Sequence, residues 1–484
     1  MPHVDADSRV CWWLLLGFAL VAPFVSLTGI PIAWDSVPLM DWQRLFEATI
    51  LFCCMAWILA SAPPLFAERT KSFYLWGLVL LLGLASTFMI AQYRDFALLE
   101  WSWVLLLVSL AAMMRLWGVI DRAALDRQIL TGILISSFAY LSWFWYLNAP
   151  IYFGSFPPHA TPAVSFPGFS NIRYFSDYQT FMLLLLPAAL DRILPRQGLP
   201  RLLGSLATGA YFALAIIAGA RSLLAAHLVL HSAMLLMFGR RYWPFLGAQL
   251  RFWLYGIVIF MVLTRLPAIL SGTHAHVAVT ELWRTDSSGR MDLWKLALEA
   301  IRQYPLLGMG PMHYASLPNP MASHPHNLML QFASEWGVLA AALLMWLVGR
   351  DLWVRLNQSA GHEIDAGQST GFLMSCALLA MLVQSMVAGT LNYPNSQVLA
   401  LLCFAYPIAD GATVNAGNWK RGASLGMIGI VALGLSIGSL TTLQRIRDRN
   451  QCYHHHPWPS PSFATRFWQQ GWIMGPCSAN QSLL

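Results

Sequence analysis

The sequence is poor in charge. Asp, Glu, Lys and Arg together make up 11% of the 484 residues, whereas soluble globular domains carry about 25%. The chain is instead 57% hydrophobic, and its apolar runs approach the ~20 residues that a helix needs to cross a bilayer. These features exclude a soluble domain and predict an all-α polytopic membrane protein.

The sequence also lacks the usual nucleotide-binding signatures. It contains no P-loop and no Gly-x-Gly-x-x-Gly pattern. The single Asp-x-Asp pair, Asp5 and Asp7, lies in the N-terminal tail. The sequence therefore gives no support for chemistry carried by a phosphate loop or by a metal-bound Asp-x-Asp pair.

Hydropathy predicts about 12–13 transmembrane helices. The expected spans are 10–29, 43–61, 73–91, 96–117, 129–148, 174–193, 202–219, 222–239, 252–270, 330–349, 370–389, 395–411 and 423–441. One set of short loops holds most of the Lys and Arg, such as Arg240 and Arg241, and cytoplasmic loops carry this excess. A large loop over 271–329 therefore falls on the opposite, outer side.

We divide the chain into a membrane domain, 1–441, and a hydrophilic C-terminal tail, 442–484. The side on which the tail lies depends on the span count. Cys452 and Cys477 could pair if the tail lies in an oxidising compartment. The net charge of +7 follows from the bias of the cytoplasmic loops, so it does not indicate binding to nucleic acid.

Two arginines lie where spans meet the outer side. Arg173 precedes Asp177 by one helical turn, so the two could form an ion pair, or Asp177 could orient an anion-binding arginine. Arg221 separates two apolar runs that as one helix would be roughly 55 Å long. The chain must therefore turn there, and the side chain could also simply extend to the membrane surface.

The large outer loop contains an amphipathic helix that begins near Arg290 and ends before Pro305. Its expected apolar stripe consists of Met291, Trp294, Leu298 and Ile301. Ser287 or Ser288 could cap its start. A helix N-terminus favours an anion, although Arg290 could also be a solvated first-turn residue. Together, Arg290, Arg173 and Arg221 would suit a polyanionic lipid head group such as a diphosphate.

The segment SHPHNLMLQFASEWG, residues 323–337, brings polar chemistry to the mouth of a span. Its candidate site residues are His324, His326, Asn327, Gln331 and Glu335. We expect a helix from about 325 into the span 330–349, with the last three residues on one side. The helix dipole would keep the histidines neutral, and a neutral imidazole can act as a general base. A His-x-His metal site and plain helix capping are the alternatives.

Together these segments resemble the signature of the O-antigen ligase/polymerase superfamily. The matching residues are Arg290, Trp294, Pro305, Gly308, Gly310, His326, Asn327, Leu330, Gln331, Glu335 and Gly337. The segments GFSNIRYFSDYQ and AGARSLLA resemble the two upstream arginine motifs of that superfamily. The similarity spans roughly residues 165–350.

The resemblance implies a GT-C-like glycosyltransferase of the bacterial inner membrane that uses neither a nucleotide sugar nor a metal or other cofactor. Such enzymes transfer a glycan from undecaprenyl diphosphate to an acceptor hydroxyl on the periplasmic face. By motif, His326 and Arg290 would be catalytic, and Arg173, Arg221 and Arg290 would bind the diphosphate. The supporting residues would be Asp177, His324, Asn327, Gln331 and Glu335.

Members of the superfamily differ in the acceptor. The chain length and the hydrophilic tail resemble the pilin O-oligosaccharyltransferases, which glycosylate Ser or Thr of type IV pilin. The alternatives are an O-antigen ligase, which transfers to lipid A-core in lipopolysaccharide biosynthesis, and an O-antigen polymerase. A transporter of the lipid-linked glycan is a further alternative, but it would need charges along a path through the membrane.

Overall fold

The computed structural model describes residues 3–24, 39–61, 71–117, 122–153, 166–271, 289–317, 322–361 and 369–406. Within these ranges every regular element is a helix and no strand occurs, which confirms the all-α prediction. The thirteenth expected span, the C-terminal tail with its two cysteines, and Ser287 and Ser288 lie outside the described residues.

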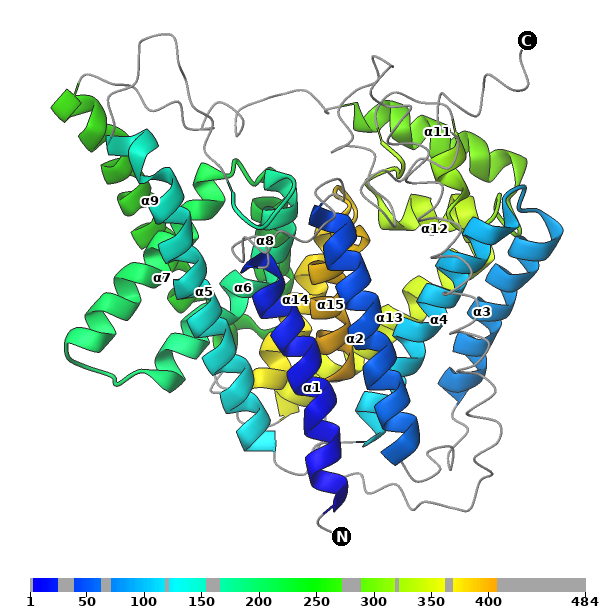
Figure 1. Ribbon diagram of the computed structural model, residues 1–484, viewed down its shortest axis with the longest axis horizontal. Coiled ribbons are helices and arrows are strands. Elements are labelled where there is room, and N and C mark those ends of the chain that lie inside the picture. The colour runs from blue at the N-terminus through cyan, green and yellow to red at the C-terminus, as the bar shows by residue number, and fades with distance from the viewer. Residues whose placement is uncertain are drawn as a thin grey trace, which may run out of the picture.

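Most helices run roughly up and down the view and form one bundle (Figure 1). The first nine are α1 (His3–Val21), α2 (Leu39–Ser61), α3 (Lys71–Met89), α4 (Arg94–Trp117), α5 (Arg122–Phe153), α6 (Ile172–Ile193), α7 (Leu199–Ile217), α8 (Arg221–Phe238) and α9 (Trp243–Ser271). They are followed by α11 (Arg290–Gln303), α12 (Leu328–Trp336), α13 (Val338–Gly361), α14 (Thr370–Gln384) and α15 (Pro394–Ala405). Short 3-10 turns, η2 (Gly239–Tyr242), η3 (His313–Ser316) and η4 (Thr390–Asn392), lie between them.

The composition of the helices fits a membrane. Four described segments are long and apolar enough to cross one: Arg94–Arg115, Arg122–Ala149, Leu199–Ile217 and Arg221–Leu263. Large apolar side chains also remain exposed on outer helices, among them Leu81 on α3 and Leu254 on α9. Exposed apolar surface on this scale is rare in soluble monomers, so these faces are suited to lipid contact.

Helix α6 forms the centre of the bundle. Every residue from Tyr174 to Leu190 is buried, and the helix packs against α5, α7 and α14. A helix that is buried all round is enclosed by other helices rather than by lipid. The start of α6, which carries Arg173, is therefore held by its neighbours.

The predicted spans from 10–29 to 395–411 each overlap described helices, with two differences. The expected continuous helix from 325 through the span 330–349 is wrong, because the chain breaks between α12 and α13 at Gly337, whose φ is 88°. The span 370–389 ends early at Gln384. The residues that follow form an irregular turn, 385–393, before α15 begins.

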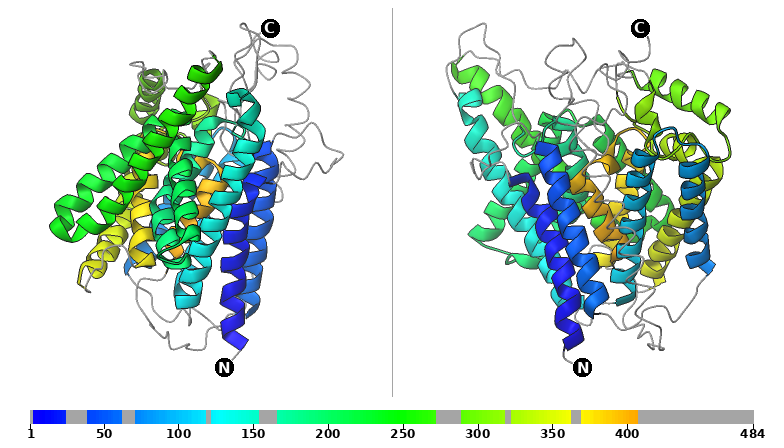
Figure 2. Two further views of the ribbon diagram at one scale, coloured as in Figure 1. Left: turned by 90° about the vertical axis from the view of Figure 1, so that its left-hand side faces the viewer. Right: turned by 45° about the vertical axis from the view of Figure 1, so that its right-hand side comes forward.

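Helix α11 lies across the end of the bundle, next to α12 (Figure 2). The predicted amphipathic helix is thus confirmed, and the face that packs on the protein differs from the expected apolar stripe. Its buried residues are Leu293, Ala297 and Ala300, whereas Met291 and Leu298 are exposed. Leu293 and Ala297 pack beside the buried Tyr314 and Ala322, so contacts with the following loop determine which face is inside.

Candidate active site

The start of α6 is shaped by the GFSN turn that precedes it. Gly168 has φ 80°, and a Cβ there would lie 1.8 Å from the carbonyl oxygen of Pro23. Asn171 then caps the helix, because its side chain accepts a hydrogen bond of 2.9 Å from the backbone N–H of Arg173. The glycine and the cap together place Arg173 in the first turn of α6.

The other two arginines also begin helices. Arg221 is the first residue of α8, after a turn in which Gly219 has φ 60°, which confirms the predicted turn. Arg290 is the first residue of α11, where Gly289 with φ 73° is the cap residue. Each arginine therefore lies beside a helix N-terminus, where backbone N–H groups also favour an anion.

The three arginines come close enough to repel one another. The pKa of Arg290 is lowered by burial first and then by Arg173 and Arg221, while Asp177 opposes the shift. The Nε of Arg290 is buried and finds no hydrogen-bond partner in the described part of the chain. Buried donors are normally paired, and a bound anion would both accept this bond and relieve the repulsion.

Asp177 lies beneath the arginines, but it does not pair with Arg173 as one reading of the sequence expected. Its side chain is buried, and Oδ1 accepts a hydrogen bond of 2.8 Å from the hydroxyl of Thr390. The carboxylate remains within electrostatic reach of Arg173 and Arg290. Asp177 therefore places a buried carboxyl group behind the arginine cluster.

His326 joins the same cluster from another segment. Its φ is 52°, a left-handed conformation that is uncommon for a residue other than glycine and costs of order 1 kcal/mol or more. Burial lowers its pKa well below the usual value, and His324, Arg290 and Arg173 lower it further. The imidazole is therefore neutral at neutral pH, as predicted, although the cause is burial and nearby charge rather than the helix dipole.

His324 restricts the tautomer of His326. The Nε2 atom of His324 lies 3.1 Å from the Nδ1 atom of His326, so one of these two nitrogens must carry a proton and donate it to the other. If Nδ1 of His326 donates, its Nε2 is left as an acceptor that can take a proton. If His324 donates, Nε2 of His326 carries the proton instead. Only the first arrangement makes His326 a base.

Asn327 and Gln331 belong to the start of α12. Asn327 is the cap residue, and its Oδ1 accepts a 2.9 Å hydrogen bond from the N–H of Leu330. The helix therefore begins at Leu328, three residues later than expected, because the cap and the left-handed His326 end the preceding loop. Gln331 is nearly buried and lines the cavity described below.

Backbone contacts explain the Pro-x-x-Gly-x-Gly and Glu-x-Gly patterns. The N–H groups of Met309 and Gly310 donate to the carbonyls of Ser334 and Glu335 at 2.8 and 3.0 Å. A Cβ on Gly308 would lie 2.3 Å from the carbonyl carbon of Glu335, and a Cβ on Gly337 would lie 1.9 Å from the oxygen of Leu306. Glycine is required because two backbone segments touch.

Glu335 supports this contact through its side chain. Its Oε1 accepts a hydrogen bond of 2.9 Å from the N–H of Tyr314, and Tyr314 in turn donates its hydroxyl to the carbonyl of Leu293 at 2.8 Å. The carboxylate therefore links α12 to the loop that follows α11. Glu335 therefore has a structural role in holding these segments together.

Sequence reasoning missed the turn 385–393. The amide of Asn327 donates to the carbonyl of Met386 at 2.9 Å, and a Cβ on Gly389 would lie 2.3 Å from Nε2 of His324. Thr390, in the same turn, holds Asp177. The polar run between two predicted spans was the available signal, but a contact more than 200 residues away from Asp177 has no local signature.

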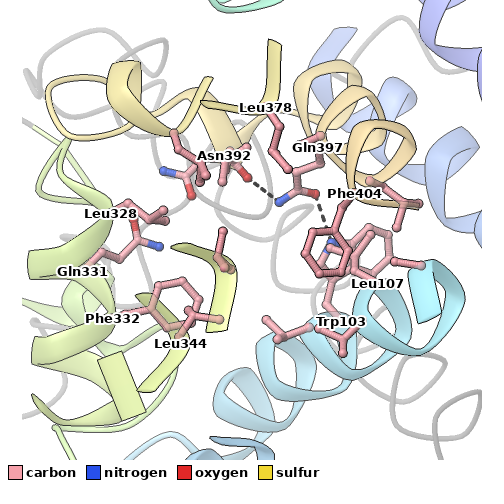
Figure 3. Close-up of a pocket in the computed structure, with 18 of the residues that line it drawn as sticks. Trp103, Leu107, Leu328, Gln331, Phe332, Leu344, Leu378, Asn392, Gln397 and Phe404 are labelled. Atoms are coloured by element: carbon pink, nitrogen blue, oxygen red, sulfur yellow. Dashed lines mark hydrogen bonds between the residues drawn. The ribbon is translucent and has the colours of Figure 1, made fainter. Parts of the chain in front are cut away.

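A cavity of about 240 Å³ opens beside α12. Leu328, Gln331 and Phe332 lie on one side of it, and Trp103 and Phe404 lie on the other (Figure 3). Most of its lining is apolar and comes from α4, α12, α13, α14 and α15. The cavity therefore combines an apolar interior with a few polar groups beside the histidine segment.

The described residues contain no group of three or more His, Cys, Asp and Glu side chains that could hold a metal ion. His274 and His276, which would take part in one alternative reading of the sequence, lie outside the described residues. The observed cluster consists instead of arginines, one carboxylate and a pair of histidines. Guanidinium groups bind phosphate and carboxylate oxygens, so this site is suited to an anionic ligand.

The fold and the site together define a helical membrane protein with a cluster of arginines and histidines at one end of its bundle. Residues 206–345 match the family model described as O-antigen ligase, which confirms the resemblance to that superfamily. The matched region includes Arg221, Arg290 and His326, while Arg173 precedes it. No curated protein matches the chain. The family is one of glycosyltransferase-type ligases that act on lipid-linked glycans and acceptors.

Proposed function

We propose that the protein is a GT-C-like O-oligosaccharyltransferase that moves a glycan from undecaprenyl diphosphate to an acceptor hydroxyl. The observation that carries this proposal is the convergence of Arg173, Arg221 and Arg290 on the same cluster as a neutral His326. One half of the cluster suits a diphosphate, and the other half suits the removal of a proton. A transferase with a diphosphate leaving group needs both.

In the proposed reaction, Nε2 of His326 takes the proton from the acceptor hydroxyl. The acceptor oxygen forms a bond to the anomeric carbon as the bond from that carbon to the diphosphate oxygen breaks. The diphosphate leaves with the electron pair, and the arginines neutralise the developing charge. Direct displacement of this kind inverts the anomeric centre. Nδ1 of His326 donates to His324 throughout, which keeps the reactive nitrogen available.

The cavity supports a donor with a lipid chain. Its apolar walls lie within the helical bundle, and Leu328 and Gln331 line it only two and five residues after His326. An isoprenoid chain in this cavity would leave its diphosphate at the end where the arginines gather. The bias of Lys and Arg in the short loops supports an outward-facing position for this end, which would be the periplasmic side of the proposed inner-membrane enzyme.

For the acceptor, we propose Ser or Thr of type IV pilin, on the resemblance of the chain length and hydrophilic tail to pilin enzymes. The description of the matching family as O-antigen ligase favours a second candidate, lipid A-core. The two differ in the product, because one modifies a protein and the other a lipopolysaccharide.

A deletion strain tests the acceptor directly. Mass spectrometry of pilin and electrophoresis of lipopolysaccharide should show unglycosylated pilin and unchanged lipopolysaccharide. Loss of O-antigen from lipid A-core with normal pilin would instead establish the ligase. Complementation with the wild-type gene and with His326→Ala separates loss of the reaction from loss of the protein. If neither product changes, the proposed function is wrong.

A further inference from the structure

Helix α2 carries a buried arginine that the proposed reaction does not use. Arg44 is 1% exposed. Its Nη1 donates to Glu47 at 2.6 Å and to Oε1 of Gln397 at 2.5 Å, and its Nη2 donates to the carbonyl of Asn392 at 2.6 Å. A buried ionised group inside a membrane domain is costly and calls for a function.

Two contacts of Arg44, those with Gln397 and Asn392, meet at the end of the turn 385–393. Gln397, which Arg44 holds, donates its own amide to the carbonyl of Leu391 at 2.5 Å and accepts from the indole of Trp103 at 3.0 Å. Two successive carbonyls of the turn, Leu391 and Asn392, are therefore fixed by two side chains from different helices. Trp103, Gln397 and Asn392 also line the cavity (Figure 3).

The neighbouring side chain holds another part of the site. The amide of Gln43 donates to the carbonyl of Gly168 at 3.0 Å, in the turn that places Arg173. One step along α2, Arg44 holds the turn that carries Thr390, and Thr390 holds Asp177. Two consecutive residues of α2 thus hydrogen-bond to the turn before α6 and to the turn 385–393.

We propose that Arg44 is a positioning residue, which with Gln43 sets the distance between the start of α6 and the turn 385–393. The proposal rests on the transferase function proposed above. Glu47 neutralises the guanidinium, so Arg44 contributes geometry rather than positive charge for the diphosphate. The turn 385–393 also holds Asn327 and lies against His324, so its position affects the histidine half of the site as well.

The geometry requires the planar fork of an arginine. A lysine at this position would keep the ion pair with Glu47, but its single ammonium group cannot hold Gln397 and the carbonyl of Asn392 in the same plane. The variant Arg44→Lys therefore retains the charge and loses the positioning. The double variant Arg44→Gln/Glu47→Gln removes both charges, so that no unpaired charge stays buried.

Two measurements on the full chain in lipid nanodiscs test the proposal. The first is hydrogen exchange by mass spectrometry. Both variants should exchange faster at 385–393 and at 324–328, with α13 unchanged. The second is transfer kinetics with a synthetic lipid-diphosphate donor. Displacement of catalytic groups by about 1 Å costs on the order of 10²-fold, so kcat should fall by that order with little change in the KM for the donor.

A matched control removes an ion pair elsewhere. The double variant Asp191→Asn/Arg201→Gln removes an ion pair between α6 and α7, and it should change neither kcat nor exchange at 385–393. If Arg44→Lys exchanges and transfers like wild type, Arg44 is not a positioning residue, whatever the reaction is. If the wild-type protein transfers nothing, the transferase function fails, while the exchange experiment still decides whether Arg44 fixes the turn.

Discussion

Replacing His326 with alanine is the sharpest test of the proposed chemistry. General base catalysis contributes about 10²–10⁴-fold, so transfer should fall by that factor, equivalent to roughly 3–5 kcal/mol of transition-state stabilisation. The donor should still bind, because the three arginines that face it are unchanged. Purified protein in nanodiscs with a fluorescent lipid-linked glycan separates the two quantities, since binding and turnover are measured on the same sample.

The pH dependence of the wild-type enzyme makes this prediction more specific. His326 has a lowered pKa in the free protein, so it stays neutral as the pH falls through 6.5, and kcat/KM should decline only at lower pH. A bound diphosphate adds negative charge beside the ring and raises its pKa. The profile of kcat should therefore begin to decline at a higher pH than that of kcat/KM.

The variant His313→Gln controls for the loss of a histidine at the same end of the bundle. His313 accepts a 2.8 Å hydrogen bond from the N–H of Tyr93 and takes no part in the arginine cluster. The rate of glycan transfer by His313→Gln should therefore change far less than that of His326→Ala. Wild-type transfer by His326→Ala would refute the assignment of the base. So would a kcat/KM that already declines between pH 8 and 7, because His326 would then be charged in the free enzyme.

Four further outcomes follow from the site and its scaffold. Arg290→Lys should slow transfer by roughly 10–100-fold, since a charge-assisted hydrogen bond of about 1.5–3 kcal/mol is lost, and single-turnover rates would measure this. Gly337→Ala should lower the Tm, because the left-handed backbone costs about 1–3 kcal/mol and the new Cβ collides, whereas Gly349→Ala, with open space around it, should leave the Tm unchanged. Thr390→Val should reduce kcat by removing the hydrogen bond that holds Asp177, and unaltered kinetics would exclude that role. EDTA should leave transfer intact, whereas a loss reversed by Zn²⁺ would favour the His-x-His metal site.

The sequence was sufficient to predict most of the helices and to locate the three arginines near helix starts. The length limit on a span forces the turn before Arg221, and the amphipathic pattern that ends at Pro305 locates α11. Both are local constraints, so they can be read without knowledge of the fold. The same holds for the polar cluster at the start of α12, where Asn327 is a typical cap residue.

Other features depend on contacts between distant segments. The break at Gly337 exists because the loop after α11 approaches the end of α12, and the hydropathy of the span contains no sign of it. The face of α11 that packs on the protein, with Leu293 and Ala297 beside Tyr314 and Ala322, could not be read from the apolar stripe, because it depends on the loop that follows the helix. The pairing of Asp177 with Thr390 and that of Arg44 with Asn392 likewise join segments that only the fold brings together.

The backbone contact between the loop 305–310 and the end of α12 also limits how the site can open. Trp294 donates its indole N–H to the carbonyl of Pro325 at 3.0 Å, so α11 is attached at the histidine segment as well as at Tyr314. The described residues 290–317 and 322–337 are therefore joined to each other at several points, and we expect them to move as one body. The distance between Arg290 and His326 would then stay constant during turnover. Because the turn 385–393 also holds this segment through Asn327, the spacing between His326 and Arg173 would be fixed as well.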